Sequence, residues 1–374
     1  MKLNLFVPLP PAGTEIANNT VRALPAITAR AEVVVWTEQS EWDSLGVDVE
    51  VRRYNQGQNL WRELNRADAT VYHIGNNHLF HGAIYEVSRQ HPGLVVLHDL
   101  CLHQLFYHLY VEQRGDAEEF LRQVGFYYGA AGRRDVAARL LHVAQHVYYL
   151  SEHYPLTPLA LENSLGALVH SRETFAALRD TSGHLPLAYT PLPFPVGPRP
   201  PLLSPNGRSG DAGAAPYQLL LFGYIGRNRR LGGILKALAE YRHRDQFRLE
   251  VYGELTDRDH WAAQVRALGL ESHVVLRGFV PEAELEAALA SAHLALNLRF
   301  PTMGEASASQ LRIWSHALPS LVSAAGWYAS LPADAVAFVR PSSEIEDLHT
   351  HFDAFLDDPS RFAEMGRRGR ELLE

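Results

Sequence analysis

Short apolar runs alternate with segments of helical period along almost the whole chain. This alternation is typical of βαβ units, in which amphipathic helices join the buried strands of a parallel sheet. In the first half, the runs predict strands at Leu3–Val7, Glu32–Trp36, Val49–Arg53, Thr70–Ile74, Leu94–His98 and Ala167–His170. In the second half, they predict strands at Gln218–Phe222, Phe247–Tyr252, His273–Leu276, Ala292–Asn297, Ser320–Ser323 and Ala335–Val339. Helical patterns fill the gaps, for example at Glu15–Ala29 and Phe80–Arg89.

The periodicity breaks once, over residues 196–216, where Pro, Gly, Ser and Ala dominate. Such a composition is typical of an interdomain linker. We therefore expect an N-terminal domain over residues 1–195 and a C-terminal domain over residues 217–374. The N-terminal domain also carries a strongly helical, aromatic-rich insertion at about residues 102–150. Aromatic stripes on helices are more often core than ligand surface, although this insertion could also shape a ligand pocket.

Length, charge and cysteine content narrow the class of protein. A chain of 374 residues is long enough for two α/β domains. The 34 basic and 42 acidic residues give a net charge of −8, which argues against non-specific nucleic-acid binding. One cysteine excludes an intrachain disulfide framework. No apolar run approaches the length of a membrane span, and Met1–Val7 is typical of a first strand. We expect a cytoplasmic protein, with peripheral membrane contact left open through mixed basic and apolar helices.

The first motif with chemistry is a glycine-containing turn that follows the strand Gln218–Phe222 and precedes a helix at Leu231–Tyr241. Glycines let a backbone approach a ligand closely, and a helix start offers free N–H groups. Arginine beside such a turn suits a diphosphate, because the planar guanidinium can bind two oxygens. A solvated basic turn is the alternative. The candidate residues are Gly223, Tyr224, Arg227, Arg229 and Arg230.

A second motif joins the strand at Ala292–Asn297 to an amphipathic helix through a loop of small residues. These small residues leave room for a ligand above the helix start, where the Glu305 carboxylate could accept hydrogen bonds from sugar hydroxyls. The alternative is that Glu305 only caps the helix and complements its dipole. The candidate residues of this loop are Thr302, Met303, Gly304, Glu305, Ala306 and Ser307.

A third set of polar residues follows three predicted strands of the first half. Open α/β sheets bind ligands beyond the carboxyl ends of their strands, so converging polar loops favour a site there. Any single residue, such as His98, is about as consistent with a hydrogen-bonded structural histidine. The candidates are Gly13, Thr14, Asn76, Asn77, His78, His98 and Asp99.

Taken in order, these segments resemble the retaining glycosyltransferases of family four, in a bacterial branch with a PTMGE-type donor loop. The resemblance covers nearly the whole chain. It rests on Pro8–Pro11, on Tyr72 to Asn76, on Val95–Leu100, on His170-Ser171, on Pro301–Glu305 and on Gly326-Trp327.

The resemblance implies the GT-B architecture, α/β with two Rossmann-like parallel-sheet domains facing across a cleft. It implies transfer of a sugar from a UDP- or GDP-sugar to a glycan, lipid-linked or protein acceptor, in glycan biosynthesis. Retention, no metal and no cofactor beyond the nucleotide-sugar substrate are also implied. Arg229 and Arg230 would bind the leaving diphosphate, and His98 and Glu305 would contact the donor sugar.

Further roles follow from the same resemblance. The base pocket would include Gly253, Glu254, Gly278 and Phe279, and the acceptor would lie on the N-terminal domain. Two positions depart from the family pattern. Tyr224 stands where an arginine often binds diphosphate, and Arg312 stands where a carboxylate often binds ribose. The nucleotide is therefore the least determined part of the prediction.

Three alternatives stay open. Asp257-Arg258-Asp259 looks like a metal-binding Asp-x-Asp motif, but its place at a helix start favours an N-cap. A nucleotide-sugar epimerase has the same architecture, although such enzymes usually rely on more carboxylates in the cleft than Glu305 and Asp99. A non-catalytic binding protein of the same fold is the third alternative.

Overall fold

The computed structural model describes residues 1–55, 57–194, 196 and 215–374. Contacts within the chain divide it into two compact units. Unit 1 comprises Met1–Pro193 together with Met303–Ala306, and unit 2 comprises Phe194–Thr302 and Ser307–Glu374. Most of the predicted linker, residues 196–216, lies outside the described residues.

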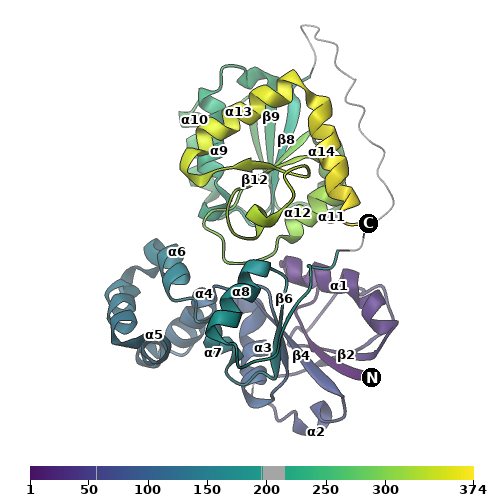
Figure 1. Ribbon diagram of the computed structural model, residues 1–374, viewed down its shortest axis with the longest axis vertical. Helices are drawn as coiled ribbons and strands as arrows, with labels where there is room; N and C mark the ends of the chain where they lie inside the picture. The colour runs from purple at the N-terminus through teal and green to yellow at the C-terminus, as the bar shows by residue number, and fades with distance from the viewer. Residues whose placement is uncertain (56, 195, 197–214) are drawn as a thin grey trace. The chain divides into compact units, whose positions relative to one another are not determined.

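Unit 1 is built on a parallel sheet of seven strands in the order β3-β2-β1-β4-β5-β6-β7. Figure 1 labels β2, β4 and β6 of this sheet. The order reverses between β1 and β4, which pair in parallel with Leu3 opposite Ala69. The strands are β1 (Lys2–Phe6), β2 (Glu32–Thr37), β3 (Glu50–Arg53), β4 (Ala69–Ile74), β5 (Leu94–Leu97), β6 (Gly166–Val169) and β7 (Leu187–Tyr189).

Helices cover both faces of this sheet because successive strand residues point to opposite sides. Leu24 of α1 packs with Leu5, Val33 and Val35 on one face, in a core cluster distinct from the larger one. The larger cluster joins Phe6 and Tyr72 to helices such as α3 and α4. The helices are α1 (Glu15–Thr28), α2 (Trp61–Leu64), α3 (His78–Gln90), α4 (His103–Tyr107), α5 (Ala117–Arg139), α6 (Val143–His153), α7 (Thr157–Leu161) and α8 (Arg172–Thr181).

The predicted helical insertion is formed by α4, α5 and α6 and the turns between them. Its aromatic side chains lie mostly in the core: Phe106 and Phe120 are completely buried. The expectation that this aromatic stripe is core is thus confirmed for these residues. Phe126, by contrast, is 72% exposed on α5, which bends at Gly129 where φ is +70°.

Unit 2 contains a parallel sheet of six strands in the order β10-β9-β8-β11-β12-β13. The order reverses between β8 and β11, which pair with Leu294 opposite Leu219. The strands are β8 (Tyr217–Phe222), β9 (Phe247–Tyr252), β10 (Val274–Gly278), β11 (Leu294–Asn297), β12 (Ser320–Ser323) and β13 (Ala337–Val339).

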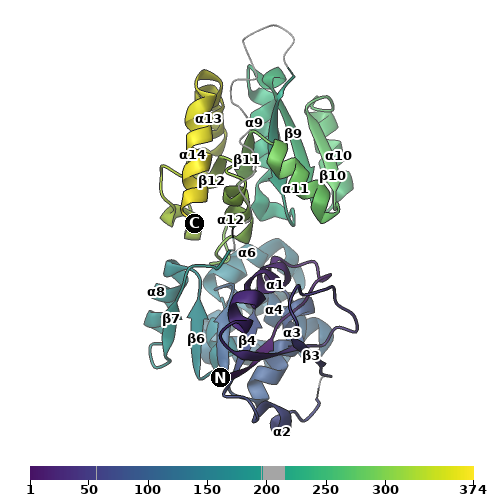
Figure 2. The same ribbon diagram turned by 90° about the vertical axis from the view of Figure 1, so that its right-hand side faces the viewer.

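Two core clusters lie on the two faces of this second sheet. One packs α9, α10, α13 and α14 against Leu219 and Leu249, and the other packs α11 and α12 against Leu220 and Phe222. Helices α13 and α14 lie side by side (Figure 2). The helices are α9 (Leu231–Glu240), α10 (Arg258–Ala267), α11 (Glu282–Ser291), α12 (Ala308–Ser315), α13 (Glu344–Asp357) and α14 (Pro359–Glu371).

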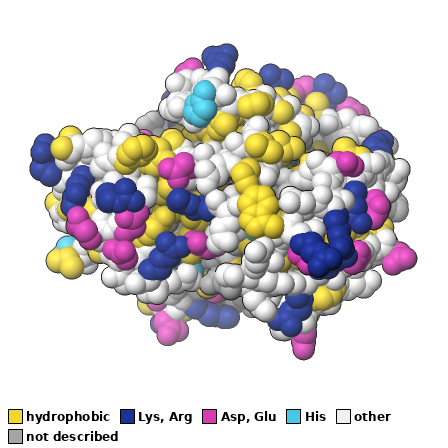
Figure 3. Space-filling view, turned by 90° about the horizontal axis from the view of Figure 1, so that it is seen from below, with side chains coloured by type: hydrophobic (Ala, Val, Ile, Leu, Met, Phe, Trp, Pro, Cys, Tyr) yellow, Lys and Arg dark blue, Asp and Glu magenta, His cyan; other side chains and the backbone are white. Residues whose placement is uncertain are grey.

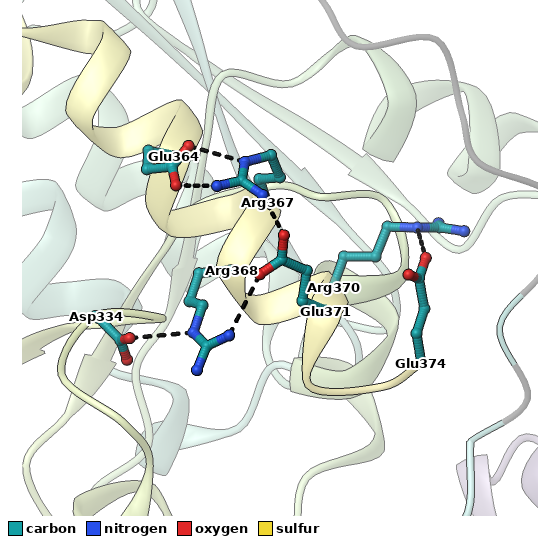
Figure 4. A network of polar contacts seen from close by, with 7 residues as sticks. All are labelled: Asp334, Glu364, Arg367, Arg368, Arg370, Glu371 and Glu374. Atoms are coloured by element: carbon teal, nitrogen blue, oxygen red, sulfur yellow. Dashed lines mark hydrogen bonds and ion pairs between the residues drawn. The ribbon is translucent and has the colours of Figure 1, made fainter.

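Helix α14 packs unusually close to α12 through two glycines. A Cβ on Gly366 would lie 2.1 Å from the Ala317 carbonyl oxygen, and one on Gly369 would lie 2.1 Å from the Trp314 ring. On its outer side, α14 carries ion pairs such as Arg368 with Asp334 at 3.1 Å (Figure 4). Exposed pairs of this kind add little stability, so the helix is held mainly by its packed face.

The predicted α/β class is confirmed, and each of the twelve predicted strands overlaps an observed one. The additional strand among the described residues is β7, three residues at the sheet edge. Its neighbourhood lacks a buried apolar run, because Leu187 and Tyr189 are only half-buried. On the face of the molecule in Figure 3, basic and acidic side chains are interspersed among apolar ones. None of the described helices is long and apolar enough to cross a bilayer.

Candidate functional site

Each sheet reverses its strand order once, and several candidate loops flank these two points, while others follow the strands β5, β9 and β10. In open α/β sheets, the loops on either side of such a reversal diverge and leave a crevice at the carboxyl edge. In unit 1 the loops follow β1 and β4, and in unit 2 they follow β8 and β11. The candidate loops therefore lie at these two carboxyl edges, as the predicted strands implied, and their binding roles stay predictions.

The edge of unit 2 is tied together by three glycines that end β8, β9 and β10. Gly223 N–H donates to the Tyr252 carbonyl at 3.0 Å, and Gly253 N–H donates to the Gly278 carbonyl at 2.7 Å. All three glycines have positive φ, at +112°, +113° and +79°. A Cβ on Gly253 would lie 2.0 Å from the Gly223 carbonyl oxygen, so only glycine fits there. The backbone is thus open to close approach along this edge.

Arg229 lies beneath the turn that follows β8, and its side chain is 1% exposed. Its guanidinium donates to Asn297 Oδ1 at 2.9 Å and to the Phe222 carbonyl at 2.5 Å. Asn297 in turn donates to Gln310 Oε1 at 2.9 Å. Arg229 therefore connects β8, β11 and α12, and it holds the shape of the turn from inside.

Arg230 and Arg227 lie nearer the surface of the same turn. Arg230 adopts left-handed φ at +60° and donates to Glu344 Oε2 at 2.7 Å. Its side chain is 33% exposed, whereas that of Glu344 is 7% exposed. Arg227 is exposed. The turn thus offers two accessible guanidinium groups above one buried guanidinium.

Two aromatic side chains and a carboxylate stand at the open end of this edge. Tyr224 is 64% exposed and Phe279 is 84% exposed, which is unusual for large apolar side chains. Glu254 is also exposed, and its carbonyl accepts from Ile225 N–H at 2.8 Å. These residues line the edge that the sequence assigned to nucleotide binding.

Arg312 stands on α12 at the position where the family resemblance implied a ribose-binding carboxylate, and its charge is balanced by nearby acidic residues. Its buried guanidinium donates to Glu282 at 2.6 Å and to Glu286 at 2.5 Å. His316 lies 2.8 Å from Glu286, and this hydrogen bond, with Arg312, lowers the pKa of Glu286 to about 2. The carboxylates thus come from α11 instead of α12, a pairing that sequence reasoning missed.

The loop after β11 begins in unit 2 with Thr302 and returns there at Ser307. Ser307 caps α12, because its hydroxyl accepts from Gln310 N–H at 3.1 Å. The Glu305 carboxylate accepts from Met303 N–H at 2.6 Å instead. The alternative that Glu305 caps the helix is therefore wrong.

The remaining loop residues, Met303–Ala306, belong to unit 1. The Leu100 N–H donates to the Met303 carbonyl at 2.8 Å, and the Thr174 hydroxyl donates to the Gly304 carbonyl at 2.7 Å. A Cβ on Gly304, whose φ is +78°, would lie 2.4 Å from that of Leu100. Glycine is required at this position by both backbone and space.

The polar candidates of unit 1 are partly structural. Thr14 caps α1 by accepting from Ile16 N–H at 3.3 Å, and Asn77 caps α3 by accepting from Leu79 N–H at 3.0 Å. Asn76 N–H donates to Asp99 Oδ2 at 2.8 Å. Two other candidates lie apart from these bonds. His78 stacks on His108 with ring centroids 4.3 Å apart, and Gly13 is exposed with open space around it.

His98 lies in a group of four histidines at the same edge. Its Nε2 is 2.9 Å from His73 Nδ1, and its ring lies 5.6 Å from that of His170. His81 Nδ1 lies 3.0 Å from the His73 carbonyl oxygen, to which it donates. Burial first, then the neighbouring imidazoles, lowers the pKa of His98 well below its usual value. The sequence signal for this group was available: three neighbouring strands each bring a histidine to their carboxyl ends.

The Asp-x-Asp segment has the structural role that was favoured for it. Asp257 caps α10 by accepting from His260 N–H at 3.2 Å. Within the described ranges, no group of three or more His, Cys, Asp or Glu side chains has a geometry that could hold a metal ion.

Known proteins resemble this chain in structure although not in sequence. No protein-family model and no curated protein matches the sequence. HepE from Anabaena, solved with UDP, aligns with a TM-score of 0.61 at 14% identity over 100% of this chain and 94% of its own. Sucrose-phosphate synthase from Thermosynechococcus elongatus aligns with a TM-score of 0.62 at 17% identity over 100% of this chain and 94% of its own.

A third structure extends the likeness. WaaG, a glycosyltransferase involved in lipopolysaccharide biosynthesis, aligns with a TM-score of 0.61 at 16% identity over 100% of this chain and 95% of its own. At such low identities the likeness shows the fold. The chain has the GT-B architecture, with two Rossmann-like domains built on parallel sheets.

Proposed function

We propose that this protein is a glycosyltransferase that moves a sugar from a nucleotide-diphosphate donor to a saccharide, lipid-linked or protein acceptor. The observation that carries the proposal is the turn after β8, where three arginines gather beside a glycine-lined backbone at the strand-order reversal of unit 2. Such a turn suits a diphosphate, because guanidinium groups and backbone N–H groups both bind anionic oxygens.

The solved relatives support a UDP-sugar as the donor. HepE was solved with UDP and with UDP-glucose, and WaaG is described as a glycosyltransferase. On this chain, the nucleotide would lie along the edge of unit 2. Phe279 and Tyr224 would offer exposed rings to the base, and Glu254, Gly253 and Gly278 would line the same pocket.

The chemistry of transfer separates the anomeric carbon from the diphosphate while negative charge grows on the leaving group. Preorganised positive groups that meet this charge usually provide the largest catalytic contribution. Arg230 and Arg227 would contact the diphosphate directly. Arg229 would add its charge from beneath the turn and keep the turn in shape, because its side chain is buried.

The sugar would meet imidazole, amide and carboxylate groups, all of which can hydrogen-bond to hydroxyls. His98 and Glu305 would contact the donor sugar, and Asn76, Asp99 and His78 would face the acceptor. We propose retention of the anomeric configuration and no requirement for metal, with the departing phosphate assisting deprotonation of the acceptor hydroxyl. No protein carboxylate then has to act as nucleophile.

The test is a calorimetric screen of UDP, GDP and their sugars, followed by NMR of the products with and without acceptors. We expect UDP to bind, and Arg230→Ala to weaken binding about tenfold, as loss of a charge-assisted bond to phosphate would. Arg242→Ala is the matched control, because this exposed residue pairs with Asp353 on α13. Equal binding by the two variants would contradict the diphosphate role.

The products discriminate between the alternatives. Transfer to an acceptor with the donor's anomeric configuration supports the proposal. Conversion of the donor sugar without acceptor would identify an epimerase instead. Binding without any turnover across a broad acceptor panel would identify a non-catalytic binding protein.

A further inference from the structure

Three neighbouring strands of unit 1 each deliver a histidine to the carboxyl edge. His73 lies near the end of β4, His98 follows β5, and His170 follows β6. His73 Nδ1 and His98 Nε2 are 2.9 Å apart, with their rings stacked at a centroid distance of 5.1 Å. The two imidazoles therefore share a hydrogen bond with each other.

The hydrogen bond between the two imidazoles restricts which nitrogen of each ring carries the proton. A neutral ring carries its proton on one nitrogen and a lone pair on the other. If His73 donates from Nδ1, then His98 accepts at Nε2 and carries its proton on Nδ1. If His98 donates from Nε2, then His73 accepts at Nδ1 and carries its proton on Nε2. The bond thus forces the two rings into the same tautomer.

The surrounding groups keep both rings neutral. His170 Nδ1 lies 3.0 Å from the Thr190 carbonyl oxygen, and His81 Nδ1 lies 3.0 Å from that of His73. Each of these two rings must donate to its carbonyl, which fixes its proton on Nδ1. Burial first, then the other imidazoles, lowers the pKa of His73 to about 3. Asp99 is the nearby carboxylate, and it accepts from Asn76 N–H at 2.8 Å.

We propose that His73 is the positioning residue for His98: it occupies Nε2, so that a bound sugar hydroxyl meets only Nδ1. The same bond sets whether that Nδ1 donates or accepts. A hydroxyl can take either part, which makes a sugar a suitable ligand for a ring whose tautomer is set elsewhere. The sugar contact rests on the proposed glycosyltransferase function, whereas the coupling of the two rings does not.

The first measurement is nitrogen-15 NMR of the histidine rings in the full chain near pH 7.5. We expect His73 and His98 to be neutral and to share one tautomer, both protonated at Nδ1 or both at Nε2. Unlike tautomers in the two rings, or two rings that titrate independently near pH 6.5, would overturn the inference. Because this readout needs no substrate, it stands even if no donor is found.

The second measurement compares three variants in the transfer assay. We expect His73→Phe to lower kcat about tenfold or more, as misplaced catalytic contacts do, while the KM for donor stays within about twofold. His73→Asn should recover most of this loss, because its amide can replace Nδ1 of the ring. His91→Phe is the matched control, since this buried histidine lies at the C-terminal end of α3 and its ring packs edge-on against Trp61.

The outcomes distinguish the positioning role of His73 from the proposed glycosyltransferase function. Equal kcat values for His73→Phe and His91→Phe would overturn the positioning role, even if the wild-type protein transfers sugar. Absence of donor binding and turnover in the wild type would overturn the proposed function, while the NMR result still decides the tautomer coupling. If His73→Phe does not fold, His73→Asn and the wild-type spectrum decide.

Discussion

The carboxyl edge of the sheet in unit 1 carries histidines and amides, whereas that in unit 2 carries arginines. Both edges arise from the same device, a reversal of strand order in a parallel sheet. At the edge of unit 1, burial and mutual repulsion keep the imidazoles neutral. At the edge of unit 2, Arg229 and Arg230 stay charged and are held by Asn297 and Glu344.

This difference shows how one topology can serve two kinds of ligand chemistry. Neutral imidazoles and amides suit hydroxyl groups, which both donate and accept hydrogen bonds. Guanidinium groups suit phosphate oxygens, which only accept. The division matches the proposed roles, with sugar at one edge and diphosphate at the other.

The largest predicted effect is a loss of folding stability at low pH, which follows from the neutral histidines at the edge of unit 1. Burial lowers the pKa of His73 to about 3 and that of His81 to about 4, so the unfolded chain takes up protons first as pH falls below 6.5. Stability should be level above about pH 7 and fall toward pH 5, by about 2 kcal/mol for each ring.

Urea denaturation at pH 7.5 and at pH 5 measures this loss. His73→Phe should make this decrease smaller by about 2 kcal/mol, because one of the rings with a lowered pKa is gone. An equal free energy of unfolding at both pH values would show that the rings are not held neutral.

The second prediction concerns the cationic edge. Arg229→Ala should lower the free energy of unfolding by about 3 kcal/mol, because the buried Asn297 Oδ1 and Phe222 carbonyl lose a charged donor. Arg227→Ala, at the exposed position two residues earlier, should change it by less than about 0.5 kcal/mol. Thermal and urea denaturation of both variants would show this contrast, and equal stabilities would mean that Arg229 does not hold the turn.

The smallest predicted effect tests how tightly the residues around the histidines are packed. A Cβ on Gly75 would lie 3.0 Å from His81 Nε2 and 3.1 Å from Asp99 Oδ2, so both side chains would have to move. Gly75→Ala should therefore destabilise the protein by about 1–2 kcal/mol. Gly13 follows another strand of the same sheet, and a Cβ at this position would have nothing within 4 Å. Gly13→Ala should therefore leave the free energy of unfolding nearly unchanged. A neutral Gly75→Ala would indicate a looser edge.

Much of the fold was predictable because a buried parallel strand appears in sequence as a short apolar run. The run at Phe247–Tyr252, for example, matches β9 residue for residue. The short edge strand β7 was missed, since its side chains are not fully buried and its run is weak. The candidate loops were placed correctly for the same reason, because each follows a recognisable strand.

The contacts within the site were less predictable because they join residues far apart in sequence. Arg229 resembled an exposed phosphate ligand, yet its partner Asn297 lies 68 residues away and draws it inside. Arg230 reaches Glu344, 114 residues away. Local sequence reports which side chains stand near a strand end, whereas only the folded chain shows which of them bind one another.

The ion pairs of Arg312 have a consequence for descent. The buried guanidinium of Arg312 is bound to Glu282 and Glu286. Replacing only the arginine, or only the two glutamates, would leave a charge without its counterpart, so the three residues have to change together. Among related chains, arginine at this position should therefore be inherited together with acidic residues on α11. Chains with a carboxylate on α12 should lack that acidic pair. Such joint inheritance would show at which branch of the family tree the arginine replaced the carboxylate. It would also identify the related chains that have the same ion pairs.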